Sequence, residues 1–238
     1  MWSRDTDVLV LLLAHMQEIG CNVWLIACTS KKQIYIPVNA IFDRLPEGSE
    51  ETLLPFHALT GSDTTSFFCK HTKKTAFDIF KIHHTPLKDI GVSELTEEKI
   101  KKTEMFVCKL YKQNVETTDE ARCLLFAKAG SPDALPPTSN ALLYHMMRVH
   151  YQTMVWRQAN ICKPILPLPV KMGWRKQNDD LIPILMDKEP IPKACKEMIS
   201  CNCAMECMNN KCSCRKSKLF CTGLCGCTKN GVCMNKDS

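Results

Sequence analysis

Apolar and polar positions divide the first 160 residues into a helix, two strands and then a series of helices. The stretch from Asp5 to Gly20 is apolar on all sides at 8–13, which predicts a buried helix capped by the aspartate and ended by the glycine. The runs 22–28 and 33–38, separated by a polar turn, are rich in β-branched and aromatic residues and predict two strands. Amphipathic or capped stretches then predict helices at 50–59, 73–83, 93–112, 117–129 and 136–158.

This order of elements is typical of the α/β class, although no later stretch offers the strands that a larger parallel sheet would need. Six prolines between 162 and 193 indicate a linker, with Gly173-Trp174 as its expected anchor. We therefore expect an α/β region, a helical region, a proline-rich linker and a small irregular cysteine-rich domain, at 1–90, 91–160, 161–194 and 195–238.

The C-terminal stretch is rich in cysteine and poor in apolar residues. Segments below about 40 residues rarely fold without a metal or disulfides. About three zinc ions need about twelve bonds, and nine thiolates supply twelve if three of them bridge two ions. A disulfide knot is the alternative, with Cys195 as a tenth thiol, but a Cys-x-Cys pair is too cramped to close on itself. The candidate zinc ligands are Cys201, Cys203, Cys207, Cys212, Cys214, Cys221, Cys225, Cys227 and Cys233.

The spacing of these nine cysteines resembles that of the tesmin-type CXC cysteine-rich domain, C-x-C-x4-C-x4-C-x-C-x6-C-x3-C-x-C-x2-C-x-N. All nine cysteines and the final Asn235 occur in order; the gap 203–207 is one residue shorter and the gap 227–233 three residues longer. The resemblance implies a knot of three zinc ions and nine cysteines, which in several members binds DNA. Members that read the minor groove have a tyrosine before the fourth cysteine, where this chain has Lys211.

The net charge of +6 is concentrated near the C-terminus, because four of these units fall within 201–238 and the first 200 residues carry only +2. A basic group in the cysteine-rich stretch is a candidate phosphate-binding surface for nucleic acid. The alternative is that these side chains only compensate the thiolate charge of a structural or metal-buffering tail. The basic group consists of Lys211, Arg215, Lys216 and Lys218.

Three acidic residues, Asp5, Asp7 and Asp63, begin or interrupt apolar segments. They are either a helix cap and turn residues, or part of the carboxylate cluster with which nucleases hold about two magnesium ions. The motifs RDTDVL at 4–9 and LTGSDT at 59–64 resemble the later half of the PIN-like flap-endonuclease fold, which implies that all three acids are magnesium ligands. In that family the first acidic residues lie on strands before the D-x-D motif, which here would precede Met1. Residues 67–74 occupy the place of the family's glycine-rich hairpin.

Together these patterns predict a zinc-binding protein that contacts nucleic acid and carries a truncated, non-catalytic nuclease-like region of mobile-element origin. The alternatives are a magnesium-dependent structure-specific nuclease whose N-terminal half lies outside this chain, and a structural or metal-buffering protein. The apolar run 8–14 is too short to span a bilayer and follows acidic residues, so we expect an intracellular, nuclear protein without a membrane partner. No motif indicates a small-molecule substrate. On the longest helix, His145, Arg148 and His150 are expected at the surface.

Overall fold

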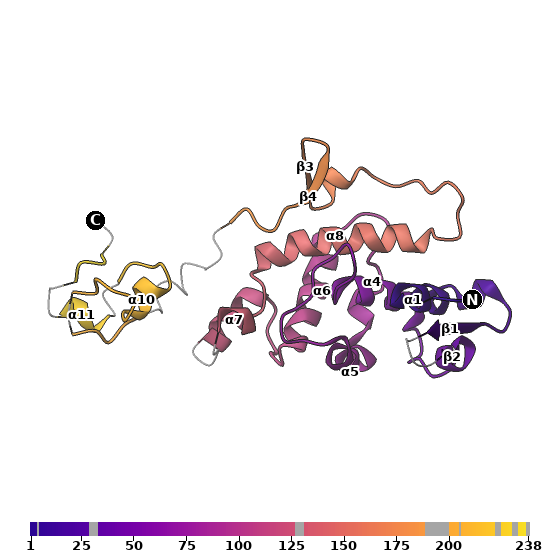
Figure 1. The fold of residues 1–238 in the computed structure, drawn as a ribbon, viewed down its shortest axis with the longest axis horizontal. Helices are drawn as coiled ribbons and strands as arrows, with labels where there is room; N and C mark the ends of the chain where they lie inside the picture. The colour runs from indigo at the N-terminus through magenta and orange to yellow at the C-terminus, as the bar shows by residue number, and fades with distance from the viewer. Residues whose placement is uncertain are drawn as a thin grey trace.

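The structure, a computed structural model, describes residues 1–3, 5–28, 33–126, 131–188, 200–204, 206–221, 225–229 and 233–236. Within these ranges the protein is mostly helical, with two small antiparallel sheets and a C-terminal cysteine-rich segment (Figure 1). The predicted turn at 29–32, the predicted helix end at 127–130 and part of the cysteine-rich spacing lie outside the described residues.

The elements follow one another in an order close to the predicted one. The longer segments of the N-terminal body are α1 (Thr6–Ala14), α2 (Met16–Ile19), β1 (Trp24–Cys28), β2 (Gln33–Pro37), α3 (Val38–Phe42), α4 (Glu50–Leu59), α5 (Lys73–His83), α6 (Glu97–Leu110), α7 (Thr118–Phe126), α8 (Ser139–Arg157), β3 (Trp174–Gln177) and β4 (Asp180–Pro183). Short 3₁₀ turns are η1 (Thr85–Leu87), η2 (Pro132–Ala134) and η3 (Pro169–Lys171), and the cysteine-rich segment contains α10 (Ser213–Lys216) and α11 (Gly226–Lys229).

The first helix begins where its cap predicts, since the Asp5 side chain accepts a hydrogen bond from the Asp7 amide at 2.9 Å. His15 interrupts it, and α2 then ends at Gly20, which adopts φ +62°. The expectation of all-round burial is wrong, because residues 8–12 are only partly buried. Helix α1 packs against α3 and α4, and the described elements leave its remaining apolar surface partly uncovered.

Strands β1 and β2 form the predicted hairpin, with Trp24 opposite Pro37 and Cys28 opposite Gln33. Residues 1–3 lie along the other edge of β1, where Trp2 bridges Ile26 in parallel. Residues 1–3 therefore add a single bridged residue, and not a further strand, to this edge. Both sheets among the described residues have only two strands, so the expected α/β region is a mostly helical body with small two-stranded sheets.

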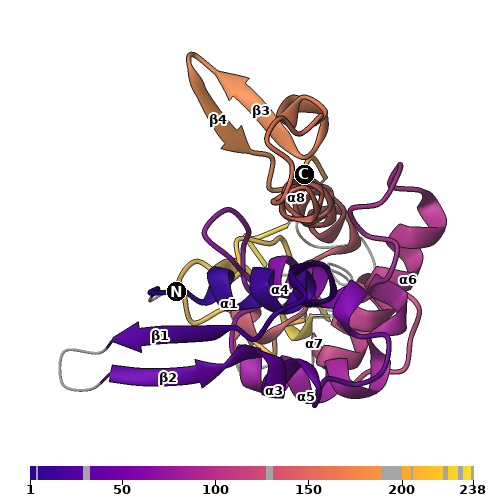
Figure 2. The ribbon, with the colours of Figure 1, turned by 90° about the vertical axis from the view of Figure 1, so that its right-hand side faces the viewer.

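A second hairpin, β3–β4, lies in the segment that the sequence indicated as linker. Arg148 on α8 holds its base, donating from Nη1 to the carbonyl of Gly173 (3.2 Å) and of Ile184 (2.6 Å). The Arg148 guanidinium also lies 5.9 Å from the centre of the Trp174 ring. Figure 2 shows the hairpin standing on α8, on the side opposite β1 and β2.

Helices α4 and α8 pack together in the core, although α4 contains Pro55. The apolar core takes side chains from α4, α5, α6 and α8, and the largest fully buried ones include Leu59, Phe80, Phe106, Leu142 and Met146. Because these helices come from distant parts of the chain, the core joins residues 50–60 to residues 139–157 and fixes the loops between them.

The three polar residues expected on the surface of α8 are buried, so that expectation is wrong. Each binds the backbone of a neighbouring segment, as Arg148 does at the β3–β4 hairpin. His145 donates from Nε2 to the Leu59 carbonyl (2.9 Å). His150 accepts the Gly91 amide at Nδ1 (2.9 Å) and donates from Nε2 to the Ser93 carbonyl (3.0 Å). They satisfy loop backbone groups that would otherwise be buried without partners.

His145 should make the body less stable in acid. Burial lowers its pKa to about 4, and its buried Nδ1 has no hydrogen-bond partner within the described part of the chain. The unfolded chain therefore binds this proton below its usual pKa of about 6.5, whereas the folded chain does not until about pH 4. The free energy of unfolding should fall by roughly 2 to 3 kcal/mol between these pH values.

Denaturant unfolding at several pH values measures this effect. His145→Gln, which keeps a donor for the Leu59 carbonyl but does not titrate, should flatten the pH dependence between 6.5 and 4. His83→Gln is the matched control, because His83 is exposed on α5. Equal pH dependence in the wild type and in His145→Gln would contradict the prediction.

Candidate metal centre

The cysteine-rich segment gathers its sulfur atoms into one buried cluster. Cys203 is half-buried and the other eight cysteines are buried. Neighbouring sulfurs lie 3.5 Å apart in Cys201–Cys227, 3.6 Å apart in Cys214–Cys225 and 3.8 Å apart in Cys212–Cys221. A tetrahedral zinc site with Zn–S bonds of about 2.3 Å has sulfurs about 3.8 Å apart. The spacing therefore fits thiolate coordination of zinc.

Three overlapping groups of four buried cysteines can each hold a metal ion, because their ligand atoms all lie within 4.8 Å of one another. The groups are Cys201, Cys207, Cys212, Cys221; Cys201, Cys221, Cys225, Cys227; and Cys207, Cys221, Cys227, Cys233. Sharing of members between groups is what a multinuclear cluster with bridging thiolates requires.

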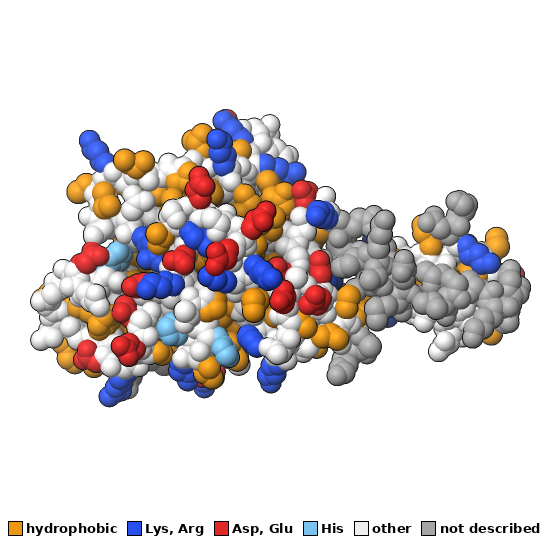
Figure 3. Space-filling view, turned by 180° about the vertical axis from the view of Figure 1, so that it is seen from behind, with side chains coloured by type: hydrophobic (Ala, Val, Ile, Leu, Met, Phe, Trp, Pro, Cys, Tyr) orange, Lys and Arg blue, Asp and Glu red, His pale blue; other side chains and the backbone are white. Residues whose placement is uncertain are grey.

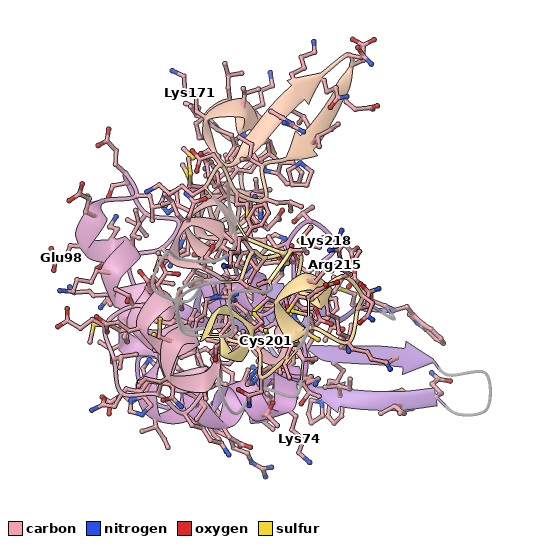
Figure 4. All side chains as sticks on the ribbon, turned by 90° about the vertical axis from the view of Figure 1, so that its left-hand side faces the viewer. Lys74, Glu98, Lys171, Cys201, Arg215 and Lys218 are labelled. Atoms are coloured by element: carbon pink, nitrogen blue, oxygen red, sulfur yellow. The ribbon has the colours of Figure 1, made fainter. Side chains whose placement is uncertain are left out.

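Short turns position these thiols. Cys212 precedes α10 and Cys214 lies within it, while Cys227 lies in α11. The start of the cysteine-rich segment lies against the start of α11, where the Gly226 amide donates to the Cys201 carbonyl at 2.6 Å. Figure 4 shows Cys201 in the middle of this segment, surrounded by the sulfur atoms.

The two cysteines outside the three groups lie beside them. The Cys203 sulfur interacts with those of Cys201, Cys207 and Cys212. The Cys214 sulfur lies 3.6 Å from that of Cys225. All nine predicted ligands therefore belong to one sulfur cluster.

Without an ion, burial disfavours the thiolate form of Cys214 and Cys227 that zinc coordination requires. Burial and neighbouring sulfurs raise the pKa of Cys214 to about 12 and of Cys227 to about 11. Burial opposes ionisation of Cys201 too, but the Cys203 amide and nearby thiols lower its pKa to about 7. A divalent ion reverses this balance, because it stabilises thiolates and releases their protons. Metal uptake should accordingly weaken as the pH falls.

Asn235, the last residue of the predicted pattern, closes the cluster. Its side-chain Nδ2 donates to the Leu219 carbonyl (2.8 Å) and to the Cys221 sulfur (3.5 Å). Its own amide donates to the Cys233 sulfur (3.4 Å), and its carbonyl accepts the Cys221 amide (2.6 Å). Such contacts to ligand atoms orient them and tune the metal site.

Asn235→Ala should therefore weaken zinc binding by about 10–100-fold, the usual effect of removing a group that orients metal ligands. Asn235→Asp, which replaces the donor by a negative charge beside Cys221, should weaken it at least as much. Competition with a chromophoric chelator measures both affinities. Asn210→Ala, at an exposed position, is the matched control, and an unchanged affinity in Asn235→Ala would refute the role of the side chain.

The four predicted basic residues are exposed beside the cluster. Arg215 donates from Nη1 to the Cys207 carbonyl (3.4 Å), so part of its guanidinium is attached to the metal-binding segment. The Lys218 amide donates to the Arg215 carbonyl at 2.9 Å, so both residues lie close together at the C-terminal end of α10 (Figure 4).

In the body, the three predicted acids line a single open cleft of about 410 Å³. Asp5 and Asp7 come from the start of α1, and Asp63 comes from the turn after α4. Lys73 and His57, the second of which no sequence pattern indicated, line the same cleft. His57 lies 2.6 Å from Asp7 Oδ1 through Nε2, and Lys73 Nζ lies 2.7 Å from His57 Nδ1.

These contacts define which ring nitrogen of His57 carries its proton. Lys73 donates to Nδ1, so His57 carries its proton on Nε2 and donates it to Asp7. Burial lowers the pKa of His57, helped by the Lys73 charge and opposed by Asp7. Burial also lowers the pKa of Lys73 to about 8, against the opposing charge of Asp7. An ammonium group therefore lies within the acidic cleft.

By itself, the described cleft supplies few ligands for a two-magnesium centre. It is lined by three carboxylates, and one oxygen of Asp5 and one of Asp7 already accept hydrogen bonds. Most of the near-octahedral positions of two magnesium ions would therefore have to be filled by water or substrate, and Lys73 contributes a competing positive charge.

No protein-family model, curated protein or solved structure matches this chain. Among the described residues, no helix combines the length and the apolar character that crossing a bilayer requires.

Proposed function

We propose that residues 201–235 form a knot of three zinc ions and nine thiolates, of the tesmin-type CXC kind, which contacts nucleic acid. The observation that supports this proposal is the set of three overlapping buried cysteine groups. Zinc is the preferred ion because an all-thiolate tetrahedral donor set selects it over magnesium or calcium.

The sulfur contacts suggest how the ligands divide. Cys221 belongs to all three groups, whereas a thiolate ordinarily bridges at most two ions. We therefore assign Cys203 in place of Cys221 to the group that contains Cys212. Cys214 takes the place of Cys221 in the group that contains Cys225. Three sites then result, with Cys201, Cys207 and Cys227 as the bridges. The proposed sites are Cys201, Cys203, Cys207, Cys212; Cys201, Cys214, Cys225, Cys227; and Cys207, Cys221, Cys227, Cys233. The third is one of the three cysteine groups unchanged, and the first two differ from theirs by one member each.

Nucleic-acid contact is proposed for the exposed group of Lys211, Arg215, Lys216 and Lys218. On the face of the body in Figure 3, acidic and basic side chains are interspersed, which agrees with the small net charge of residues 1–200. With Lys211 where minor-groove readers have tyrosine, we expect phosphate contacts on DNA or RNA without sequence preference.

The salt dependence of binding tests this proposal. If both side chains contact phosphates, Lys216→Gln/Lys218→Gln should reduce the slope of log K against log salt by about 2. Lys74→Gln/Lys163→Gln removes the same charge from exposed positions of the body and should leave the slope unchanged. Gel shifts with duplex DNA, single-stranded DNA and RNA measure both, and absence of salt-dependent binding by the wild type at low ionic strength would end the nucleic-acid proposal.

For the body we propose a degenerate nuclease-like region that does not cut. The cleft shared by the three acids supports the resemblance to the later half of the PIN-like fold. The same cleft is the observation that favours the alternative, a magnesium-dependent nuclease completed by further strands. We expect flap and nicked duplexes to stay intact with magnesium, and cleavage that Asp63→Asn abolishes would establish the alternative.

A further inference from the structure

The segment between α8 and β3 exposes apolar side chains to solvent. Residues 161–168 lie outside any helix or strand, and Figure 1 shows this stretch as a long loop standing off the end of α8. Ile165 is 89% exposed and Leu168 is 70% exposed, among the highest values for large apolar residues in the described chain. Neither the metal centre nor the acidic cleft uses this segment.

Prolines favour the extended polyproline II conformation for residues 163–168, and the 3₁₀ turn η3 follows at Pro169–Lys171. Prolines at 164, 167 and 169 fix their own φ near −65°, and each disfavours the helical region for the residue before it. Leu168, which precedes a proline, has φ −68° and ψ 131°, close to polyproline II values. Most of 163–169 therefore has little conformational freedom to lose on binding.

In polyproline II, residues three positions apart lie on the same edge. Ile165 and Leu168 are exposed on one edge and Pro164 is exposed on the next, whereas Leu166, Pro167 and Pro169 are half-buried. An apolar edge thus faces solvent, and the exposed Lys171 follows it in η3. Figure 4 shows Lys171 near the base of the β3–β4 hairpin, with its side chain directed outward.

Both ends of the segment are held in place. The Gln158 side chain accepts the Ile165 amide at 3.1 Å and donates to the Ile165 carbonyl at 3.4 Å. At the other end, the Met172 amide donates to the Pro169 carbonyl at 2.8 Å, next to Gly173, which Arg148 holds. A ligand that is already ordered pays less conformational entropy when it binds.

We propose that residues 163–171 are a docking segment for a partner domain that recognises polyproline II ligands, of the SH3 or WW type. Such domains present aromatic-lined grooves that accept prolines spaced as Pro164 and Pro167 are, together with adjacent apolar side chains. Lys163 and Lys171 flank the segment, so the matching groove carries acidic residues at its ends.

Arrays of purified SH3 and WW domains, probed with the full-length chain, test the proposal. At least one domain with an acidic groove should bind, and Pro164→Ala/Pro167→Ala should weaken that binding at least tenfold. Leu168→Asp should weaken it similarly, whereas Ile82→Asp, at a position 73% exposed on α5, should leave it unchanged. Circular dichroism and thermal unfolding check that each variant remains folded.

Three results would overturn the proposal. The first is that no domain of either type binds the wild-type chain, and the second is that a domain binds but is insensitive to the proline and Leu168 variants. The third is that sedimentation shows the chain to self-associate and Leu168→Asp abolishes that association, which would assign the exposed edge to a second copy of the chain. Removal of zinc with a chelator should not affect binding to a domain, which separates this test from that of the metal centre.

Discussion

Replacing Cys227 by serine should remove at least two of the three zinc ions, whereas replacing Cys225 should remove one. Both thiols are buried in the same cluster and lie two residues apart. Cys227 is a shared member of two of the cysteine groups, while Cys225 belongs to a single group. The difference therefore follows from bridging, because serine at a bridge leaves two ions with three thiolates each.

Metal analysis of the reduced full-length chain, with native mass spectrometry, measures the stoichiometry. The wild type should contain about three zinc ions. Cys162→Ser should retain them, because Cys162 is an exposed thiol of the body. Equal losses in Cys225→Ser and Cys227→Ser would refute the division of ligands but not the knot, whereas a reduced wild type without metal would refute the knot itself.

Loss of zinc should also unfold the segment. Structural zinc contributes roughly 10–16 kcal/mol of apparent binding free energy in small zinc-dependent folds. The segment has few apolar side chains to replace that contribution, and Met208, Phe220 and Met234 are exposed. A strong chelator should make amides of 201–235 exchange rapidly with solvent while those of α4 and α8 stay protected, which hydrogen-exchange mass spectrometry can measure.

Local signals predicted the elements that depend on nearby residues. Helix α5 has the predicted bounds because Thr72 caps it, its side chain accepting the Thr75 amide, and Pro86 follows its end. Helix α8 begins after Thr138, which caps it in the same way. The cysteine cluster was predictable for a similar reason, since spacing alone brings the thiols of a short segment together.

Contacts between distant residues were not predictable in the same way. His57 and Asp7 are separated by 50 positions, and no pattern near either residue indicates their contact. The β3–β4 hairpin was missed because Trp174–Gln177 is mostly exposed and lacks an apolar face. Helix α6 begins at Glu97 instead of residue 93, because Thr96 caps it and Lys99 binds the carbonyls of Val92 and Glu94.

The buried histidines of α8 were misplaced for a related reason. An imidazole on an amphipathic helix is ordinarily exposed unless a neighbouring backbone group binds it. Here the loop at 90–93 covers His150 and supplies both an amide and a carbonyl. That loop approaches α8 closely at Gly91, where an added Cβ would meet Thr153.

Gly91→Ala should destabilise the body by about 2–4 kcal/mol. Gly91 has φ +75°, a conformation that costs a residue with a Cβ about 1 kcal/mol. The new Cβ would also lie 2.7 Å from Thr153 Cβ and closer still to Thr153 Cγ2, and Thr153 is fully buried on α8. Overpacking of this kind typically costs a further 1–3 kcal/mol. Small domains have about 5–15 kcal/mol in total, so the loss should be visible as a much lower unfolding midpoint.

Gly48→Ala separates the two contributions, because Gly48 has φ +72° but no heavy atom within 4 Å of the added Cβ. It should cost about 1 kcal/mol, the backbone contribution alone. Thr153→Ala should then recover part of the Gly91→Ala loss in the double variant, since it removes Cγ2, the nearest contact. Denaturant unfolding of the wild type, Gly91→Ala, Thr153→Ala and the double variant gives the coupling energy between the two positions. If Gly91→Ala cost no more than Gly48→Ala, the loop at 90–93 would not pack on α8 as described, and the burial of His150 would lose its support.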